Sequence, residues 1–193
     1  MKSSLACGVV VALATLASCN STGASAPAFR SGTQNVGVAF ALAQDDLSDT
    51  FNEGEIESVD LSGNWGYFVS PHVEVGASLG YSSEQQTLNG ATVVDSDLTT
   101  FGVSSRYYFA SEGQVRPYVG AGVGILGGSS GDIDIDGNYY GLAAGLAAFL
   151  SESVALDARF TKAWSTEDWS DGIGTADIDR DMFAFLVGLS FYF

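Results

Sequence analysis

Three aspartates at alternate positions form the clearest ligand pattern in the sequence. Asp132, Asp134 and Asp136 are followed by Gly137, and D-x-D-x-D-G is the opening of an EF-hand calcium loop. The twelfth position of such a loop would be Ala143, where calcium binding needs a bidentate glutamate. The pattern therefore predicts a candidate cation site at Asp132, Asp134 and Asp136, without an EF-hand around it.

The sequence contains no recognisable catalytic constellation. It has one histidine, His72, and its two cysteines, Cys7 and Cys19, lie near the start of the chain. There is no nucleophile elbow, and the glycine-rich run at 120–124 alternates along a strand instead of joining a strand to a helix. We therefore expect no catalytic residues, no cofactor and no enzymatic activity.

Composition narrows the class of protein further. The chain of 193 residues has 7 Lys and Arg against 23 Asp and Glu, a formal net charge of −16. So few basic residues argue against a nucleic-acid partner. A hydrophobic content of 46% argues against a disordered acidic chain, and 24 glycines with many aromatics favour a β-rich fold.

The N-terminal segment is typical of an export signal. Residues 1–19 combine Lys2 with an apolar run that is too short to span a membrane as a helix. The run ends in Leu16-Ala17-Ser18-Cys19, which resembles a bacterial lipobox and makes Cys19 a lipidation candidate; the alternative is ordinary cleavage after Ala28. Residues 20–33 are rich in Ser, Gly and Ala and are interpreted as a flexible lead-in.

From residue 34 to residue 193 the hydrophobic pattern has a period of two. Eight segments of about ten residues alternate bulky apolar residues with small or polar ones, the length of a tilted membrane-crossing strand. These segments lie at 36–42, 59–69, 73–81, 101–109, 118–125, 140–150, 154–161 and 183–193.

The connections between these segments alternate in length. Short connections lie at 70–72, 110–114 and 151–153, and long ones at roughly 44–55, 83–97, 126–137 and 165–180. This layout predicts an all-β fold, an eight-stranded antiparallel up-and-down transmembrane β-barrel over residues 34–193. A soluble ligand-binding barrel is the alternative, but its outer face would carry mostly Gly, Ala and Ser and too little charge.

Four charged residues fall at positions that should face the barrel lumen near the short turns: Glu74, Arg106, Asp157 and Arg159. Two acids and two arginines can neutralise one another there, whereas an arginine facing the lipid midplane costs about 2–4 kcal/mol. The group is interpreted as a fixed plug; the alternative is a gate that opens a small pore.

The strand pattern resembles the eight-stranded outer-membrane barrels that include the OmpA transmembrane domain, OmpX and OmpW-like proteins. The resemblance is carried by Arg116–Gly124, by Gly66–Gly76 across the first short turn, and by the terminal Phe191-Tyr192-Phe193. It implies a bacterial outer-membrane location with the long loops facing the cell exterior. It also implies that Phe193 is the C-terminal signal for the barrel-assembly machinery.

Eighteen of the 23 acidic residues lie in the four long connections or beside them, and Arg180 is the only base among them. We therefore expect a non-enzymatic outer-membrane protein with a structural or surface-interaction role through acidic loops. Its expected partners are outer-membrane lipids, lipopolysaccharide and a surface ligand, although loop acidity can also serve solubility alone. A small cation-favouring pore is the alternative function, and a lipid-modifying enzyme is a more distant one.

Overall fold

The computed structural model describes residues 28–49, 52–88, 91–170 and 174–193. These residues form eight β-strands. The strands are β1 Gln34–Asp49, β2 Asn52–Ser70, β3 Val73–Leu88, β4 Ala91–Tyr108, β5 Val115–Ser130, β6 Ile133–Phe149, β7 Val154–Ser170 and β8 Thr175–Tyr192.

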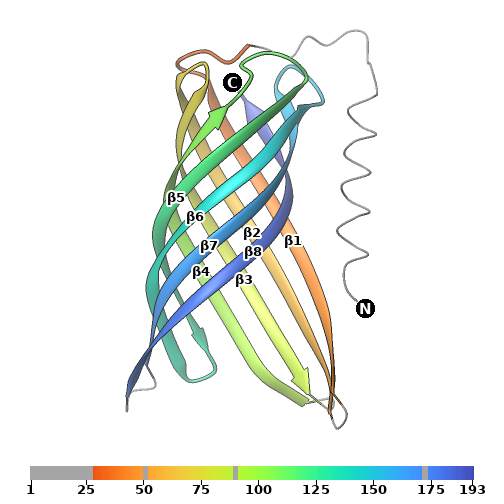
Figure 1. Cartoon of the computed structure of the whole chain (residues 1–193), viewed down its shortest axis with the longest axis vertical. Coiled ribbons are helices and arrows are strands. Elements are labelled where there is room, and N and C mark those ends of the chain that lie inside the picture. The colour runs from red at the N-terminus through yellow and green to blue at the C-terminus, as the bar shows by residue number, and fades with distance from the viewer. Residues whose placement is uncertain (1–27, 50–51, 89–90, 171–173) are drawn as a thin grey trace.

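The strands close into an up-and-down barrel, as the period-two pattern predicts. Each strand pairs antiparallel with its sequence neighbours, and β1 pairs with β8 to complete the ring (Figure 1). The connections near 71–72, 109–114 and 150–153 lie at one end of the barrel, together with the C-terminus. We call this the short-turn end, and the opposite end the long-hairpin end. No helix in the described ranges is long and apolar enough to span a membrane.

The four long connections differ from the loops expected from the sequence. Each strand has 16 to 19 residues, so most of each predicted loop is a continuation of the two strands beside it. Ser130 pairs with Ile133 at the tip of the β5–β6 hairpin, where Gly131 has a positive φ of 60°. The sequence did not predict these strand extensions because their residues are mostly polar, and hydrophobic alternation identifies only strands that have one apolar face.

The outer surface is apolar through the middle of the barrel. Val38, Phe40, Leu79, Val103 and Val123 are each more than half exposed, although they occupy the centres of their strands. Such exposure is unfavourable in water but suits the hydrocarbon of a bilayer. Alternate residues on the same strands face the interior, so each strand has a lipid face and a lumen face.

The residues just before β1 differ from the flexible lead-in expected over 20–33. Phe29 is 2% exposed, and its backbone N–H donates to the carbonyl of Ser111 at 2.9 Å. Gly32 and Thr33 exchange backbone hydrogen bonds with Phe68. The segment 28–33 therefore folds across the short-turn end, because the side chain of Phe29 packs against apolar residues there.

The junction between the first and last strands is the shortest in the described sheet. β1 pairs with β8 over six residues, from Asn35 opposite Tyr192 to Phe40 opposite Val187. The other neighbouring strands pair over 13 to 17 positions. The two strands separate beyond this junction toward the long-hairpin end, as Figure 1 shows.

Candidate functional site

The lumen is closed at the short-turn end by a layer of aromatic side chains. This aromatic plate consists of Phe29, Phe68, Tyr108, Phe149 and Tyr192, each less than 5% exposed. The ring of Phe29 lies 4.2 Å from that of Phe68, 4.9 Å from Tyr108 and 5.2 Å from Tyr192, measured between centroids. These separations are typical of aromatic pairs in protein cores, so the plate fills the cross-section by packing.

Arg116 is buried within this layer. Its guanidinium carbon lies 3.9 Å from the ring centroid of Phe29 and 4.2 Å from that of Phe149. Its Nε donates a hydrogen bond to the carbonyl of Gly113 at 3.0 Å. Arginine placed against aromatic faces gains cation–π attraction, which rises when water is excluded. Arg116 therefore strengthens the aromatic plate instead of leaving a polar gap in it.

Two of the four predicted lumen charges form an ion pair above the aromatic plate. Arg106 Nη1 lies 3.7 Å from Glu74 Oε1, and both side chains are less than 10% exposed. Glu74 Oε2 also accepts hydrogen bonds from Asn35 Nδ2 at 3.1 Å and from Tyr108 OH at 2.9 Å. A buried carboxylate with this many donors is well compensated, and removing one partner would leave an unpaired charge.

Asp157 and Arg159 do not pair in the same way. Both carboxylate oxygens of Asp157 accept from the hydroxyl of Tyr118, at 2.9 and 3.0 Å. Arg159 instead donates from Nη2 to Ser62 Oγ at 3.1 Å, across the lumen from β7 to β2. The four charges therefore do not form one cluster. Glu74 pairs with Arg106, Asp157 accepts from Tyr118, and Arg159 donates to Ser62.

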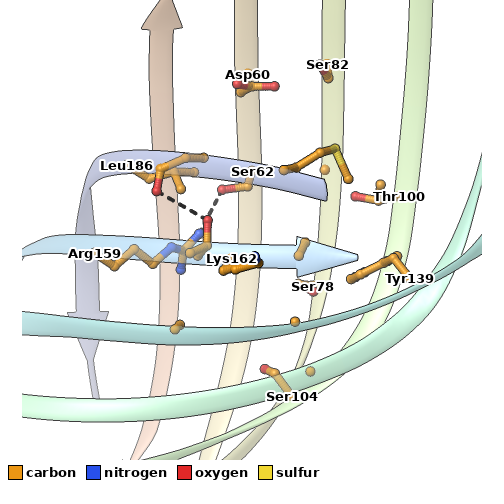
Figure 2. Close-up of a pocket in the computed structure, with 18 of the residues that line it drawn as sticks. Asp60, Ser62, Ser78, Ser82, Thr100, Ser104, Tyr139, Arg159, Lys162 and Leu186 are labelled. Carbon is orange, nitrogen blue, oxygen red and sulfur yellow. Dashed lines mark hydrogen bonds between the residues drawn. The ribbon is translucent and has the colours of Figure 1, made fainter. Parts of the chain in front are cut away.

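Above these charges the lumen contains a cavity of about 610 Å³. Its polar lining comes mainly from small hydroxyl side chains, and glycines on β5 leave room for it. Figure 2 shows the labelled part of this lining, which includes Asp60, Ser62, Ser78, Ser82, Thr100, Ser104, Tyr139 and Arg159. The lumen is therefore a cup with a closed floor at the short-turn end.

The three aspartates of the predicted cation site lie at the long-hairpin end. Asp132 is in the β5–β6 turn, and Asp134 and Asp136 lie on the outward side of β6; all three are exposed. Positions two apart on an extended strand are about 6.6–6.8 Å apart, unlike positions in a coiled calcium loop. Within the described ranges, no three acidic, histidine or cysteine side chains are arranged to hold a metal ion.

Asp136 instead belongs to a row of carboxylates across three strands. It pairs with Asp168 on β7, which pairs with Asp177 on β8. The hydrogen bond that protonated Asp168 shares with Asp177, followed by desolvation and the charges of Asp177 and Asp136, raises the pKa of Asp168 above its ordinary value. This acidic row is the most concentrated negative charge that the described hairpins present outward.

A third buried carboxylate, besides those of Glu74 and Asp157, lies inside the long-hairpin end. Glu167 is fully buried, and it accepts hydrogen bonds from Ser165 Oγ at 2.7 Å and from Trp169 Nε1 at 3.0 Å. Arg180 Nε lies 3.7 Å from the same carboxylate. These contacts join β7 to β8 beyond the lipid-facing band and stiffen the hairpin that carries much of the acidic row.

Phe193 and His72, which the sequence analysis also singled out, lie away from the lumen cavity. Phe193 is 68% exposed at the short-turn end, and its backbone N–H and carbonyl bond those of Gln34. His72 lies in the β2–β3 turn, where its Nδ1 donates to the carbonyl of Tyr108 at 2.8 Å. Cys19 lies outside the described residues.

The aromatic plate and the role of Arg116 were not predicted from the sequence. Phe68, Tyr108 and Arg116 occupy lumen-facing positions of their strands, so strand parity contained a signal for them. Bulky side chains at several lumen positions near the short turns would have indicated a filled end. Phe29 precedes the first strand, where no periodicity specifies its direction.

The fold, with a lumen that is closed at one end, defines a transmembrane barrel of the small, eight-stranded class. The chain belongs to the outer membrane protein beta-barrel domain family, whose model matches residues 10–191. This confirms the predicted family and fold class. No curated protein matches the sequence.

Solved structures share the fold at low sequence identity. OprG from Pseudomonas aeruginosa is 12% identical with a TM-score of 0.61, over 86% of this chain and 98% of that one. Neisserial surface protein A is 18% identical with a TM-score of 0.60, over 84% and 98%. AlkL, solved in lipid bilayers, is 18% identical with a TM-score of 0.55, over 90% and 96%. At such identities the likeness establishes the architecture alone.

Proposed function

We propose that this protein is a non-enzymatic outer-membrane barrel that does not conduct solutes through its lumen and acts at the cell surface through its acidic hairpins. The observation that carries the proposal is the closed floor of the lumen. The aromatic plate fills the short-turn end, and the ion pair of Glu74 with Arg106 lies directly above it. A through-pore would require both layers to move.

The long hairpins support the surface role. Asp136, Asp168 and Asp177 form an exposed row, and the Glu167 contacts keep the strands that carry it in register. A rigid anionic surface attracts cationic groups and repels anions over about a Debye length, near 8 Å at physiological salt. We assign these hairpins to the cell exterior, with lipopolysaccharide-bound cations and a basic surface ligand as partners.

The short-turn end supports the assembly and location parts of the proposal. Phe193 ends an alternating strand with its ring exposed, which suits recognition by the barrel-assembly machinery before the barrel closes. His72 is held in a turn at this same end, opposite the outward row of aspartates. A lipid-modifying site that used this histidine would lack the outer-leaflet position that such chemistry needs.

Planar-bilayer conductance tests the closed floor. We expect the purified, folded protein to remain electrically silent, whereas a variant with Phe29, Tyr108, Phe149, Glu74 and Arg106 all replaced by alanine, which removes both layers, should conduct. The matched control replaces the three outward residues Val38, Leu79 and Val103 by alanine and should stay silent. Steady cation conductance by the unchanged protein would overturn the proposal in favour of a pore.

The surface role is tested separately by cell-binding assays. Replacing Asp136, Asp168 and Asp177 by asparagine should reduce binding of intact cells to a basic polypeptide, while the heat-dependent gel mobility of the barrel stays unchanged. Equal binding by both forms would refute a role for the acidic row.

A further inference from the structure

Arg159 carries a positive charge into the middle of the lumen. It lies in the first half of β7, five residues after Val154, where the strand begins. Among the described residues, no carboxylate lies within 4.0 Å of its guanidinium, whereas Arg106 and Arg180 each have one. Its buried Nε has no hydrogen-bond partner among the described residues, and Ser62 Oγ accepts from Nη2. An arginine at the wall of this cavity that has, in the described ranges, no carboxylate partner and a free Nε–H offers its charge and its donors to a bound anion.

The surroundings of Arg159 define the chemistry of that group. The cavity of about 610 Å³ has room for on the order of 20 water molecules at about 30 Å³ each. Ser62, Ser78 and Thr161 supply hydroxyl donors to its walls, and Leu186 and Met182 supply apolar surface. We infer that the cavity is a binding site for a small monocarboxylate, with the carboxylate on Arg159 and the apolar chain against Leu186 and Met182.

The upper part of the same cavity sets the charge of the ligand. Asp60 and Glu84 line it, on the lumen-facing sides of β2 and β3 and nearer the long-hairpin end than Ser62. Their carboxylates would repel a second negative charge carried at the far end of a ligand. A neutral or apolar tail meets no such repulsion. The cavity therefore favours a monocarboxylate over a dicarboxylate of the same length.

The direct test uses butyrate and succinate with the folded full barrel in detergent. We expect butyrate to shift the side-chain NMR signal of Arg159 Nε–H in a saturable manner and to bind at least about tenfold more tightly than succinate, because charge repulsion of this order is common at short range. Sodium chloride at matched concentration controls for ionic strength. No saturable shift with butyrate, or tighter binding of succinate, would overturn the inference.

Variants separate the site from a general salt effect. Arg159→Gln should weaken butyrate binding by about tenfold or more, the usual loss when a hydrogen bond to a charged group is removed. Arg30→Gln makes the same change at an exposed residue of the short-turn end and should leave binding unchanged. Asp60→Asn should tighten succinate binding without changing gel mobility. Equal affinities for the unchanged protein and Arg159→Gln would overturn the inference, even if the lumen proves closed to conduction.

Discussion

The guanidinium of Arg116 lies over the ring of Phe29, with 3.9 Å between its central carbon and the ring centroid. The contact joins a residue that precedes the first strand to a residue in the middle of the chain. It also places a permanent charge inside an aromatic layer that excludes water. The stability of the short-turn end should therefore depend strongly on Phe29, although the residues around Phe29 in the sequence are mostly small.

Replacing Phe29 by alanine should lower the free energy of unfolding by about 3 kcal/mol, because a fully packed aromatic side chain is removed from the aromatic plate. Urea-induced unfolding in lipid vesicles, followed by tryptophan fluorescence, measures the change. Ser31→Ala alters an exposed residue of the same segment and should change stability by less than about 0.5 kcal/mol. A similar small loss for both variants would contradict the packing described here.

Replacing Glu74 by glutamine should destabilise the barrel by about 3 kcal/mol, because Arg106 then remains buried without its carboxylate. The double variant Glu74→Gln, Arg106→Met should be less destabilised than the sum of the two single variants. A double-mutant cycle from the same unfolding experiment gives this coupling. Glu112→Gln, at an exposed acid of the short-turn end, is the matched control, and additive effects of the two substitutions would argue against the pair.

The pH dependence of the acidic row follows from Asp168. Its pKa is raised in the folded protein by the hydrogen bond with Asp177, so the folded state holds this proton to a higher pH than the unfolded chain does. The contribution of Asp168 to stability therefore decreases as pH rises from its unfolded pKa through its raised folded pKa. Carboxyl carbon NMR should show a titration midpoint of Asp168 above the ordinary range of aspartate, and Asp177→Ala should lower it. An unchanged midpoint in the variant would exclude Asp177 as the cause.

Replacing Glu167 by glutamine should loosen the β7–β8 hairpin without opening the barrel. The neutral side chain loses the attraction of Arg180, and Ser165 and Trp169 lose a charged acceptor, where a hydrogen bond to a charged group contributes about 1.5–3 kcal/mol. Hydrogen exchange should accelerate at 165–170 and 174–180 and stay constant at 154–160. Asp132→Asn, in an exposed turn, should leave both regions unchanged. Uniform acceleration along β7 would show that Glu167 supports the whole barrel instead.

Strand parity predicts much of this molecule, and its failures have physical causes. Val103 faces outward and Arg106 inward because side chains alternate along a strand, and the same rule applies to Glu74 and Asp157. Strand parity predicts whether a side chain faces the lumen or the lipid, but not which residue it contacts. The hydrogen bond from Arg159 to Ser62 therefore could not be predicted. The extensions of the strands into the long hairpins were not predicted, because their residues are mostly polar and show no regular hydrophobic alternation.

The backbone around the predicted cation site differs from the loop that the motif describes, for a related reason. Asp132, Asp134 and Asp136 match a calcium loop only if the backbone coils, and a hairpin keeps them extended. The ends of strands are decided by pairing with a neighbour, which a local motif does not contain. Phe29 is a further case, since its pocket is assembled from β2, β4, β6 and β8 together.

The position of Phe29 against Tyr192 also bears on the order of folding. The two residues are separated by most of the described chain, and the six-residue junction of β1 with β8 lies beside them. Contacts of such long sequence separation form late, because the chain between them must first be organised. The aromatic plate is therefore completed only when the first and last strands meet. Protection of the Phe29 ring would mark the last step of barrel formation, and its exposure would mark a ring that has not yet closed.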